Sequence, residues 1–486
     1  MRSDKAYGDD AQTAETGCAA GLRKRFPPRE VLDCFVFTGL LPLVLFPLAN
    51  FVRNMSGSHG YFNIWRDYMF VLAPIGLILT VVCWFLSRDR VSLGCVRDTV
   101  KRNLPLLWFA ALAAWMLIST AVTGYTYESC IGAEKSRAGL LACLCFFVYL
   151  LLCVVWRDLG MQKTWLAVFV DVGGLLSLFI VLDFYLLGEK YGVCYQNLVF
   201  YNWNHLAYFL LVVTVAAAVQ ILLERNRCCR ITAIIAFACG EAALVIADTL
   251  GTLIGLAFGL IFMFPVLALT GRKRMIKWLA VICIAAVLIV VIMAFVPSTS
   301  AKHDVAEMIR GNIRELLRME KASEGDMLNL PGDIGSGRGL LWNEAFRCIR
   351  ESPIFGKGLD VMRQRLAIAT DYQNNTVHNE FLEYATNNGL PALIFYICGI
   401  LHIFIRGLRN RKKLTDMNVL GLCVAFAYLV SAVFGVLMFY TAPFMFVFLG
   451  LGYYREGMCG RAFGDDMSAP EAGAGCKRKA GITAAV

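Results

Sequence analysis

Long apolar runs separated by short polar stretches dominate the pattern of positions along this chain of 486 residues. A run of about 18 or more apolar residues is long enough to cross a bilayer as a helix. The pattern predicts an all-α polytopic membrane protein, because a helix satisfies its backbone hydrogen bonds internally. Twelve spans are predicted, at residues 31–52, 68–87, 104–124, 138–156, 165–187, 205–223, 231–248, 251–270, 278–296, 389–405, 417–438 and 441–454.

Composition and charge placement agree with that class. The chain is 58% hydrophobic and 17% charged, whereas soluble domains have roughly half and a quarter. The formal charge of +10 lies mostly in short loops between spans, which is the positive-inside pattern. We therefore expect a lipid bilayer and no nucleic acid as partner. Both termini are predicted to be cytoplasmic, with cytoplasmic basic loops at 88–102, 225–230, 272–277 and 406–413.

The same pattern divides the chain into five parts. Residues 1–30 are predicted to form a basic cytoplasmic tail, 31–296 the first nine spans, 389–454 the last three and 455–486 a second cytoplasmic tail. The remaining part, 297–388, is too long for a connector and too apolar for disorder. We interpret it as a large helical extracytoplasmic loop.

Helical periodicity and capping residues predict four helices in this loop. Amphipathic helices are expected at 303–328 and 338–351, and shorter ones from Asp360 to Ala369 and from Thr376 to Gly389.

The cysteines and the N-terminus add two expectations. Most of the 18 cysteines fall in apolar spans, where Cys acts as a small hydrophobe. We predict no disulfide framework, although a Cys130–Cys194 bridge stays open. No cleavable signal peptide precedes the first span, which is expected to be a retained start-transfer helix.

His378 is the first candidate catalytic residue. In a helix that begins at Thr376, it would share a face with apolar side chains close above the membrane. An imidazole there can act as a general base, and the alternative is a core histidine bonded to a backbone carbonyl. Asn379, Glu380 and Glu383 fall on other faces, where they would either orient an acceptor sugar or be solvated.

Arg338 is the second candidate. It begins its predicted helix after a Gly-Ser-Gly stretch, and a guanidinium beside free backbone N–H groups suits an anion such as a phosphate. The alternative is a surface arginine paired with Glu344 or with an anionic lipid. Lys357, in the sequence F-G-K-G, is a second candidate phosphate contact.

Polar residues also begin the sixth span. The run from Tyr201 through Asn202, Trp203 and Asn204 to His205 has amides and aromatic rings that can bind sugars or anchor a helix at the interface.

Four acids lie within the predicted spans. No Arg or Lys lies within the spans to pair with them, so we expect them to be protonated or hydrogen-bonded. Asp183 and Asp248 lie toward the outer side, where they can reach the site. The four acids are Asp171, Asp183, Glu241 and Asp248.

Several motifs are absent from the sequence. There is no Walker loop, no dinucleotide fingerprint, no metal-ligand spacing and no Asp-x-Asp pair, so we expect neither a metal nor another cofactor. A site on the outer face has no nucleotide supply, and a polyprenyl diphosphate would provide the activated donor instead.

The motifs together resemble the O-antigen ligase and polymerase superfamily. G-R-x-x-x-W is found at 337–342, P-x-x-G-x-G at 353–358, and H-N at His378 with Gly389 following. The segment 202–207 is similar to the N-x-N-h-L-A segment of the family, and the twelve spans with a large loop before the last three also match.

The resemblance, which covers roughly residues 195–400, implies a GT-C-like glycosyltransferase of the bacterial plasma membrane. It implies metal-independent transfer of a glycan from undecaprenyl diphosphate to a hydroxyl of a glycan, lipid or protein acceptor on the outer face. His378 would deprotonate or position the acceptor, and Arg338 would hold the diphosphate. The candidate substrate-binding residues are Asn379, Lys357, Asn202, Asn204, His205 and Glu383.

The chain departs from the family at one turn. The family usually carries an S-R-G-like turn after the seventh span, whereas this chain has Thr249-Leu250-Gly251. Loss of one charge-assisted contact would cost about 1.5–3 kcal/mol of binding. This departure keeps open a glycan-binding protein without catalysis. A flippase is a separate alternative, which would need a polar path through the spans and inverted repeats.

Overall fold

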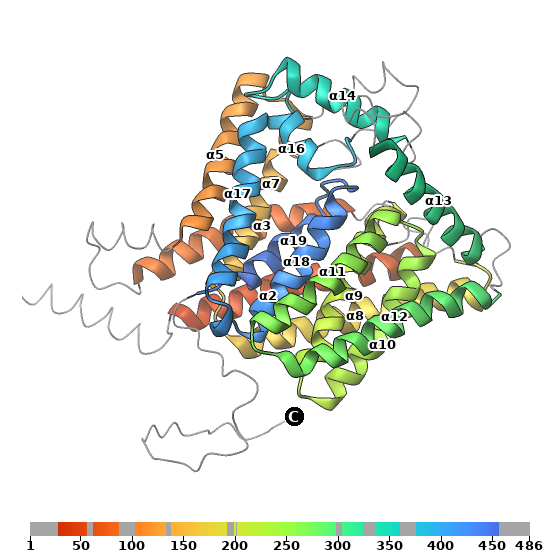
Figure 1. Cartoon of the computed structure of the whole chain (residues 1–486). Coiled ribbons are helices and arrows are strands. Elements are labelled where there is room, and N and C mark those ends of the chain that lie inside the picture. Colours follow the sequence, from red (N-terminus) through yellow and green to blue (C-terminus); the bar gives the residue numbers. More distant parts are fainter. Residues whose placement is uncertain are drawn as a thin grey trace, which may run out of the picture.

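The structure is a computed structural model, and it describes residues 28–55, 62–86, 103–132, 138–191, 199–200, 202–297, 304–323, 337–359 and 376–455. The regular elements of these residues are helices (Figure 1). Each predicted span coincides with one of them. The twelve helices are α2 (Pro28–Met55), α3 (Phe62–Leu86), α5 (Leu104–Thr123), α7 (Leu140–Val155), α8 (Leu159–Tyr185), α9 (Trp203–Leu223), α10 (Arg227–Ile246), α11 (Leu250–Leu269), α12 (Ile276–Phe295), α17 (Leu390–Arg409), α18 (Asp416–Ala432) and α19 (Ala442–Gly452).

The predicted fold class, an all-α polytopic membrane protein, is confirmed. Among the described residues, nine helices are long and apolar enough to cross a membrane, while α7, α18 and α19 are shorter apolar helices. α18 ends at Ala432, before the predicted end at 438, and turns follow it until α19. Those turns carry Gly435, where a Cβ would overlap the hydroxyl of Tyr208 on α9.

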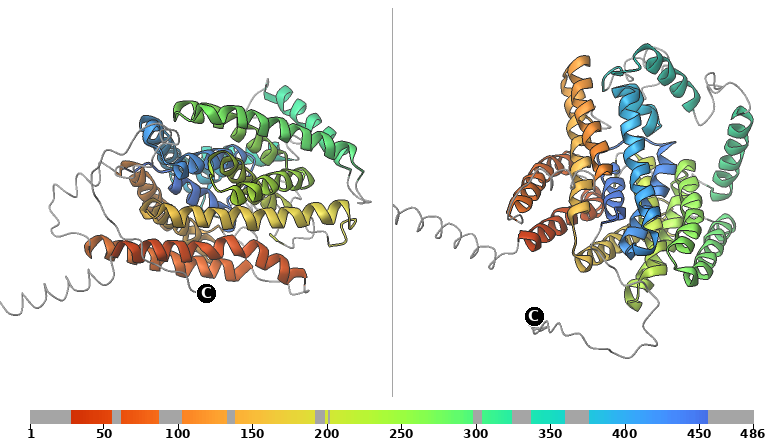
Figure 2. Two further views of the ribbon diagram at one scale, coloured as in Figure 1. Left: turned by 90° about the horizontal axis from the view of Figure 1, so that it is seen from below. Right: turned by 60° about the vertical axis from the view of Figure 1, so that its left-hand side comes forward.

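α9 is the central helix of the bundle, buried along almost its whole length between α8, α10, α11 and α18. α2 and α3 pack together on the side of the bundle away from α12 (Figure 2). α11 approaches α18 through Gly255 and Gly259, and a Cβ at Gly255 would lie 2.9 Å from the carbonyl oxygen of Ala427, while Gly251 faces Phe434 in the turns after α18. Glycines four apart allow such close helix packing, and the opposite face of α11 points away from α18.

Three further helices lie at one end of the bundle (Figure 1): α13 (Val305–Ser323), α14 (Arg338–Glu351) and α16 (Glu380–Asn388). The predicted helix at 338–351 is confirmed, and the one at 303–328 is confirmed over Val305–Ser323. Residues 303 and 324–328 and the predicted helix from Asp360 to Ala369 lie outside the described residues. The predicted start at Thr376 is wrong, because Asn379 caps α16 by accepting a hydrogen bond from the Leu382 N–H at 3.0 Å. α16 ends at Gly389, as predicted.

The segment 353–358 fixes the end of α16. The Lys357 N–H donates to the Thr386 carbonyl at 2.8 Å, and the Gly358 N–H donates to the Asn387 carbonyl at 3.0 Å. The Phe355 ring stacks on Trp115 of α5 with ring centroids 5.5 Å apart. The P-x-x-G-x-G motif therefore holds α16 against α5.

Two glycines with positive φ give a matched test of this arrangement. Gly389 (φ +85°) has no room for a side chain, since a Cβ would overlap the carbonyl oxygen of Ile354, whereas Gly337 (φ +92°) has open space around it. Gly337→Ala should cost only the left-handed backbone penalty, about 1–2 kcal/mol. Gly389→Ala should be clearly more destabilising in thermal unfolding of the purified protein, and equal effects would contradict the packing at Gly389.

The basic loops that the structure describes, at 225–230, 272–277 and 406–413, gather at the other end of the bundle. α17 starts beside α16 and runs toward that end, where α11 also finishes (Figure 1). There Arg272 forms an ion pair with Asp416 at 2.7 Å and donates to the Leu414 carbonyl at 3.1 Å. Cys194 lies outside the described residues, so the Cys130–Cys194 bridge stays a prediction.

Candidate active site

Arg338 and His378 lie on segments that a small apolar cluster holds together. Arg338 is the first residue of α14, and His378 precedes the cap of α16. Val377 is 1% exposed and packs with Leu341 and Ala345 of α14. Val377, the residue before His378, is thereby packed against α14, the helix that begins at Arg338.

His378 has an unusual backbone and a shifted pKa. Its φ is +53°, in the left-handed region that non-glycine residues seldom adopt. It therefore lies outside α16, and the predicted helical face around it is wrong. Burial and, to a smaller extent, the charge of Arg338 together lower the pKa of His378 from 6.5 to about 4. The imidazole is neutral at pH 7, and it also lies within electrostatic range of His205.

Arg338 faces a polar cavity of about 440 Å³ between the ends of α9 and α11 and the helices α13 and α14. Burial lowers the pKa of Arg338, whereas the nearby Tyr208 and Glu315 raise it. The guanidinium stays protonated at neutral pH in either case. Glu344, the predicted surface partner, lies 3.3 Å from Arg347. The polar residues lining this cavity are Asn204, Asp248, Thr249, Glu307, Asn312, Glu315 and Arg338.

The three predicted binding residues at the start of α9 have different surroundings. The Asn202 side chain caps α9 by accepting a hydrogen bond from the Asn204 N–H at 2.8 Å. The Asn204 Oδ1 accepts a hydrogen bond from the Thr249 hydroxyl at 2.9 Å, and Asn204 lines the polar cavity. His205 Nδ1 and the Tyr440 hydroxyl are 2.6 Å apart.

Glu380 and Glu383 are buried, with 1% and 8% exposure, so the expectation that they are solvated is wrong. The Tyr428 hydroxyl donates to Glu380 at 2.6 Å, and the Leu437 N–H donates to Glu383 at 3.3 Å. Burial raises the pKa of Glu380 to about 8 and that of Glu383 to about 7. At pH 7 Glu380 is mostly the neutral acid.

Two other predicted binding residues have structural contacts. The Lys357 ammonium lies 2.8 Å from the Glu351 carboxylate, within the segment that holds α16. The Asn379 side chain is the cap of α16. Contacts of these residues with a substrate stay a prediction.

Several neighbours of the site were not among the predicted binding residues. Tyr208 lies one helical turn after His205, and Glu315 lies on the polar side of α13. The spacing of Tyr208 from His205 was visible in the sequence. The sequence did not show that α9 and α13 line the same cavity. Asp248, predicted to reach the site, lines the cavity and accepts a hydrogen bond from the Asn312 amide at 2.8 Å. Asp183 instead accepts one from the Tyr191 N–H at 3.0 Å.

Glu380 gives a pH prediction. Its pKa is raised from 4.5 to about 8 in the folded protein, so the folded state retains a proton that the unfolded chain loses above pH 4.5. The folded state should thus lose stability as pH rises from about 5 to 8. Glu380→Gln keeps a neutral partner for Tyr428, and its melting temperature relative to wild type should rise across this range. A constant difference from pH 5 to 9 would contradict the buried acid.

The fold and the site define a class: a multi-pass helical membrane protein with a neutral histidine and a partly buried arginine at one end of its bundle. Residues 232–397, about a third of the chain, match the family model described as O-antigen ligase. This match supports the predicted superfamily. The family implies a glycosyl-transfer enzyme that acts in membrane glycan processing. No curated protein matches the chain.

The matched region has a clear place in the structure. It runs from α10 to α17 and includes α13, α14 and α16. Arg338 and His378 both lie within it, whereas His205 and Asn204 lie before it. Glycan and lipid partners fit a family of this kind.

Proposed function

We propose that the chain transfers a glycan from undecaprenyl diphosphate to an acceptor hydroxyl on the outer face of the bacterial plasma membrane, with no need for a metal ion. The observation that carries the proposal is the pairing of a neutral imidazole, His378, with a partly buried guanidinium, Arg338, which lines a polar cavity. A neutral imidazole can accept a proton, and a guanidinium can hold a phosphate.

The chemistry needs both groups. The acceptor oxygen attacks the anomeric carbon of the donor, and the bond from that carbon to the diphosphate oxygen breaks. His378 takes the proton of the acceptor hydroxyl. Arg338 stabilises the charge that develops on the leaving diphosphate, an effect that is strong in a site shielded from water.

The acids of the cavity suggest where the glycan lies. Asp248, Glu307 and Glu315 line the cavity with Arg338. Carboxylates would repel a diphosphate but accept hydrogen bonds from sugar hydroxyls. We therefore assign the sugar to the acidic wall and the diphosphate to the side of Arg338 and His378.

Leu250 is the family departure, and it lines the cavity wall. The cationic contact expected at this turn is replaced by an apolar side chain at the start of α11. The proposal therefore assigns the diphosphate mainly to Arg338. Loss of Arg338 should therefore lower the rate of transfer more in this protein than in a family member in which two arginines bind the diphosphate.

The side of the membrane is inferred from charge. The three described basic loops, at 225–230, 272–277 and 406–413, lie at the end of the bundle away from Arg338 and His378, and basic loops face the cytoplasm. This arrangement supports a site on the extracytoplasmic face. Labelling of Cys130 and of engineered cysteines in loop 406–413 with an impermeant thiol reagent tests the side, and labelling of the basic loop from outside would refute it.

The transfer itself is tested with the purified protein, a polyprenyl-diphosphate glycan and a panel of glycan, lipid and protein acceptors. A product that carries the glycan, formed equally well with a metal chelator, supports the proposal. Movement of the donor across vesicles without product would indicate a flippase. Donor binding without either would indicate a glycan-binding protein.

A further inference from the structure

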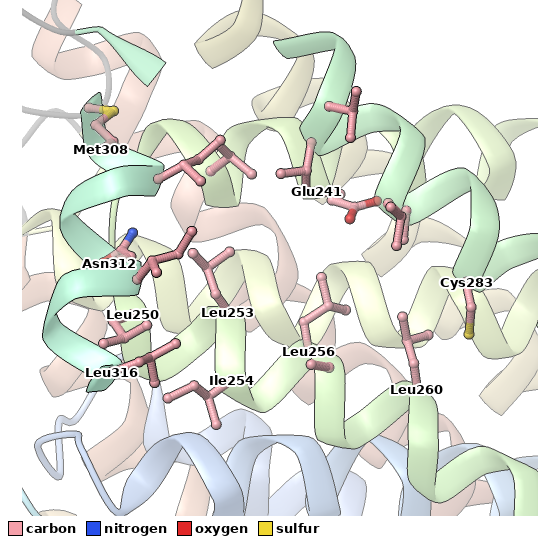
Figure 3. A pocket seen from close by; sticks show the side chains of 18 of the residues that line it. Glu241, Leu250, Leu253, Ile254, Leu256, Leu260, Cys283, Met308, Asn312 and Leu316 are labelled. Carbon is pink, nitrogen blue, oxygen red and sulfur yellow. The ribbon is translucent and has the colours of Figure 1, made fainter. Parts of the chain in front are cut away.

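A second cavity, of about 540 Å³, lies among α10, α11, α12 and α13. We call it the groove (Figure 3). Its walls are mostly aliphatic and include the face of α11 opposite the glycines that pack on α18. Ile261 of α11 and Val287 of α12 are more than half exposed, so the groove opens toward lipid. It meets the polar cavity at Leu250, Ile254 and Met308.

Two polar side chains lie in these walls: Asn312, where the groove meets the polar cavity and whose amide donates to Asp248 at 2.8 Å, and Glu241, the acidic residue. Its carboxyl group points into the groove (Figure 3), although the residue is only 3% exposed. Among the described residues, its Oε2 has no hydrogen-bond partner. An unpaired carboxylate is costly in such surroundings, which favours the neutral acid. A neutral acid offers one O–H donor, and an unmet buried donor is itself unfavourable.

The depth of Glu241 limits what can meet that donor. It lies five residues before the end of α10, about 8 Å along the helix axis. The groove then follows α11 from Leu250 to Ile261, about 16 Å, which is close to the hydrocarbon depth of one leaflet. The ester carbonyls of an acyl lipid lie a short distance below its headgroup, as Glu241 lies about 8 Å below the end of α10. The chain of a prenyl diphosphate is hydrocarbon from its first carbon.

We propose that the groove binds an acyl lipid of the bilayer, whose ester or amide carbonyl accepts a hydrogen bond from the carboxylic acid of Glu241. The aliphatic walls hold the acyl chain, and the headgroup lies toward the polar cavity. This site is independent of the proposed glycan transfer, because lipid binding is measured without donor or acceptor.

A matched lipid pair tests the hydrogen bond. An ester lipid and an ether lipid with the same headgroup and chain lengths differ only in the carbonyl oxygens. Both compete for the purified full-length protein in detergent, and bound lipid is counted by native mass spectrometry. Wild type should prefer the ester lipid roughly tenfold, the usual effect of one net hydrogen bond.

Two variants complete this test. Glu241→Gln should keep the preference, because its amide still donates, and Glu241→Leu should abolish it. Leu removes a buried polar group that no described residue satisfies, so the variant should fold. No ester preference in wild type, or the same preference in Glu241→Leu, would overturn the proposal. The proposal would also be overturned if polyprenyl phosphate displaced the ester lipid from wild type and from Glu241→Leu equally well.

A hydrophobic carbodiimide gives a second readout that needs no variant. The carboxyl oxygen of the neutral acid adds to the central carbon of the reagent while the acid proton moves to nitrogen. The acyl group then shifts to nitrogen, so an N-acylurea forms and nothing leaves. Modification of Glu241, read by peptide mass, should be slowed by the ester lipid more than by the ether lipid. Equal rates with both lipids would refute the carbonyl contact.

Discussion

Arg338→Ala is expected to lower the rate of glycan transfer by about 10²–10⁴-fold. A guanidinium can give a phosphate two charge-assisted hydrogen bonds, each contributing about 1.5–3 kcal/mol. Leu250 occupies the turn where the family has a second arginine, so we expect little compensation. The measurement is kcat/KM of the purified protein with a polyprenyl-diphosphate glycan, separated into kcat and KM.

Two variants control this experiment. Arg338→Lys keeps the charge but loses the paired geometry, so its activity should fall between wild type and Arg338→Ala. Arg347→Ala changes a mostly exposed residue of the same helix, whose guanidinium lies 3.3 Å from Glu344, and should retain activity. Near-normal transfer by Arg338→Ala would remove the role assigned to this residue, provided that the protein is inserted normally.

The sequence predicted the helices well, because each apolar span is a local signal. The predicted ends of the helices differ from the observed ends where tertiary contacts determine them. α18 stops at Ala432 because the turns after it pack Gly435 under Tyr208 and bring Tyr440 to His205. Nothing in the apolar run 417–438 reveals a contact with α9.

The site was predicted less completely, for the same reason. Arg338 was expected at a helix start, and α14 does begin there. The sequence could not show that α16 begins at Glu380, because Thr376 and Asn379 are both good caps. It also could not show that Glu380 meets Tyr428, since a pair separated by 48 residues depends on the packing of α16 on α18. Burial of acids this close to a surface loop is set by the fold.

Lys357 has a structural role that the sequence did not predict, while its contact with a phosphate stays a prediction. A lysine between two glycines suggests a phosphate contact. In the structure its ammonium forms an ion pair with Glu351, and its backbone N–H donates to the Thr386 carbonyl. The motif is needed for packing: a Cβ at Gly356 would lie 2.5 Å from the Asn387 carbonyl carbon. A recurring motif near a site can therefore serve the position of the site and not its chemistry.

His378→Ala is expected to lower transfer by about 10²–10⁴-fold, the usual contribution of a general base. The pH profile of wild type gives the sharper test. Burial and the neighbouring Arg338 lower the pKa of His378 from 6.5 to about 4. Its base form therefore persists through pH 5, and the loss of activity due to its protonation should come near pH 4. A loss centred at 6.5 would contradict the buried neutral imidazole.

The coupling between the two residues makes the same profile diagnostic. Without the guanidinium, the pKa of His378 should move up toward 6.5, so the residual activity of Arg338→Ala should be lost at higher pH than that of wild type. Glu383, with a pKa of about 7, would alter the profile in the neutral range, and Glu383→Gln separates its contribution. An acid limb that stays in place in Arg338→Ala would mean that these two side chains do not act on each other during transfer.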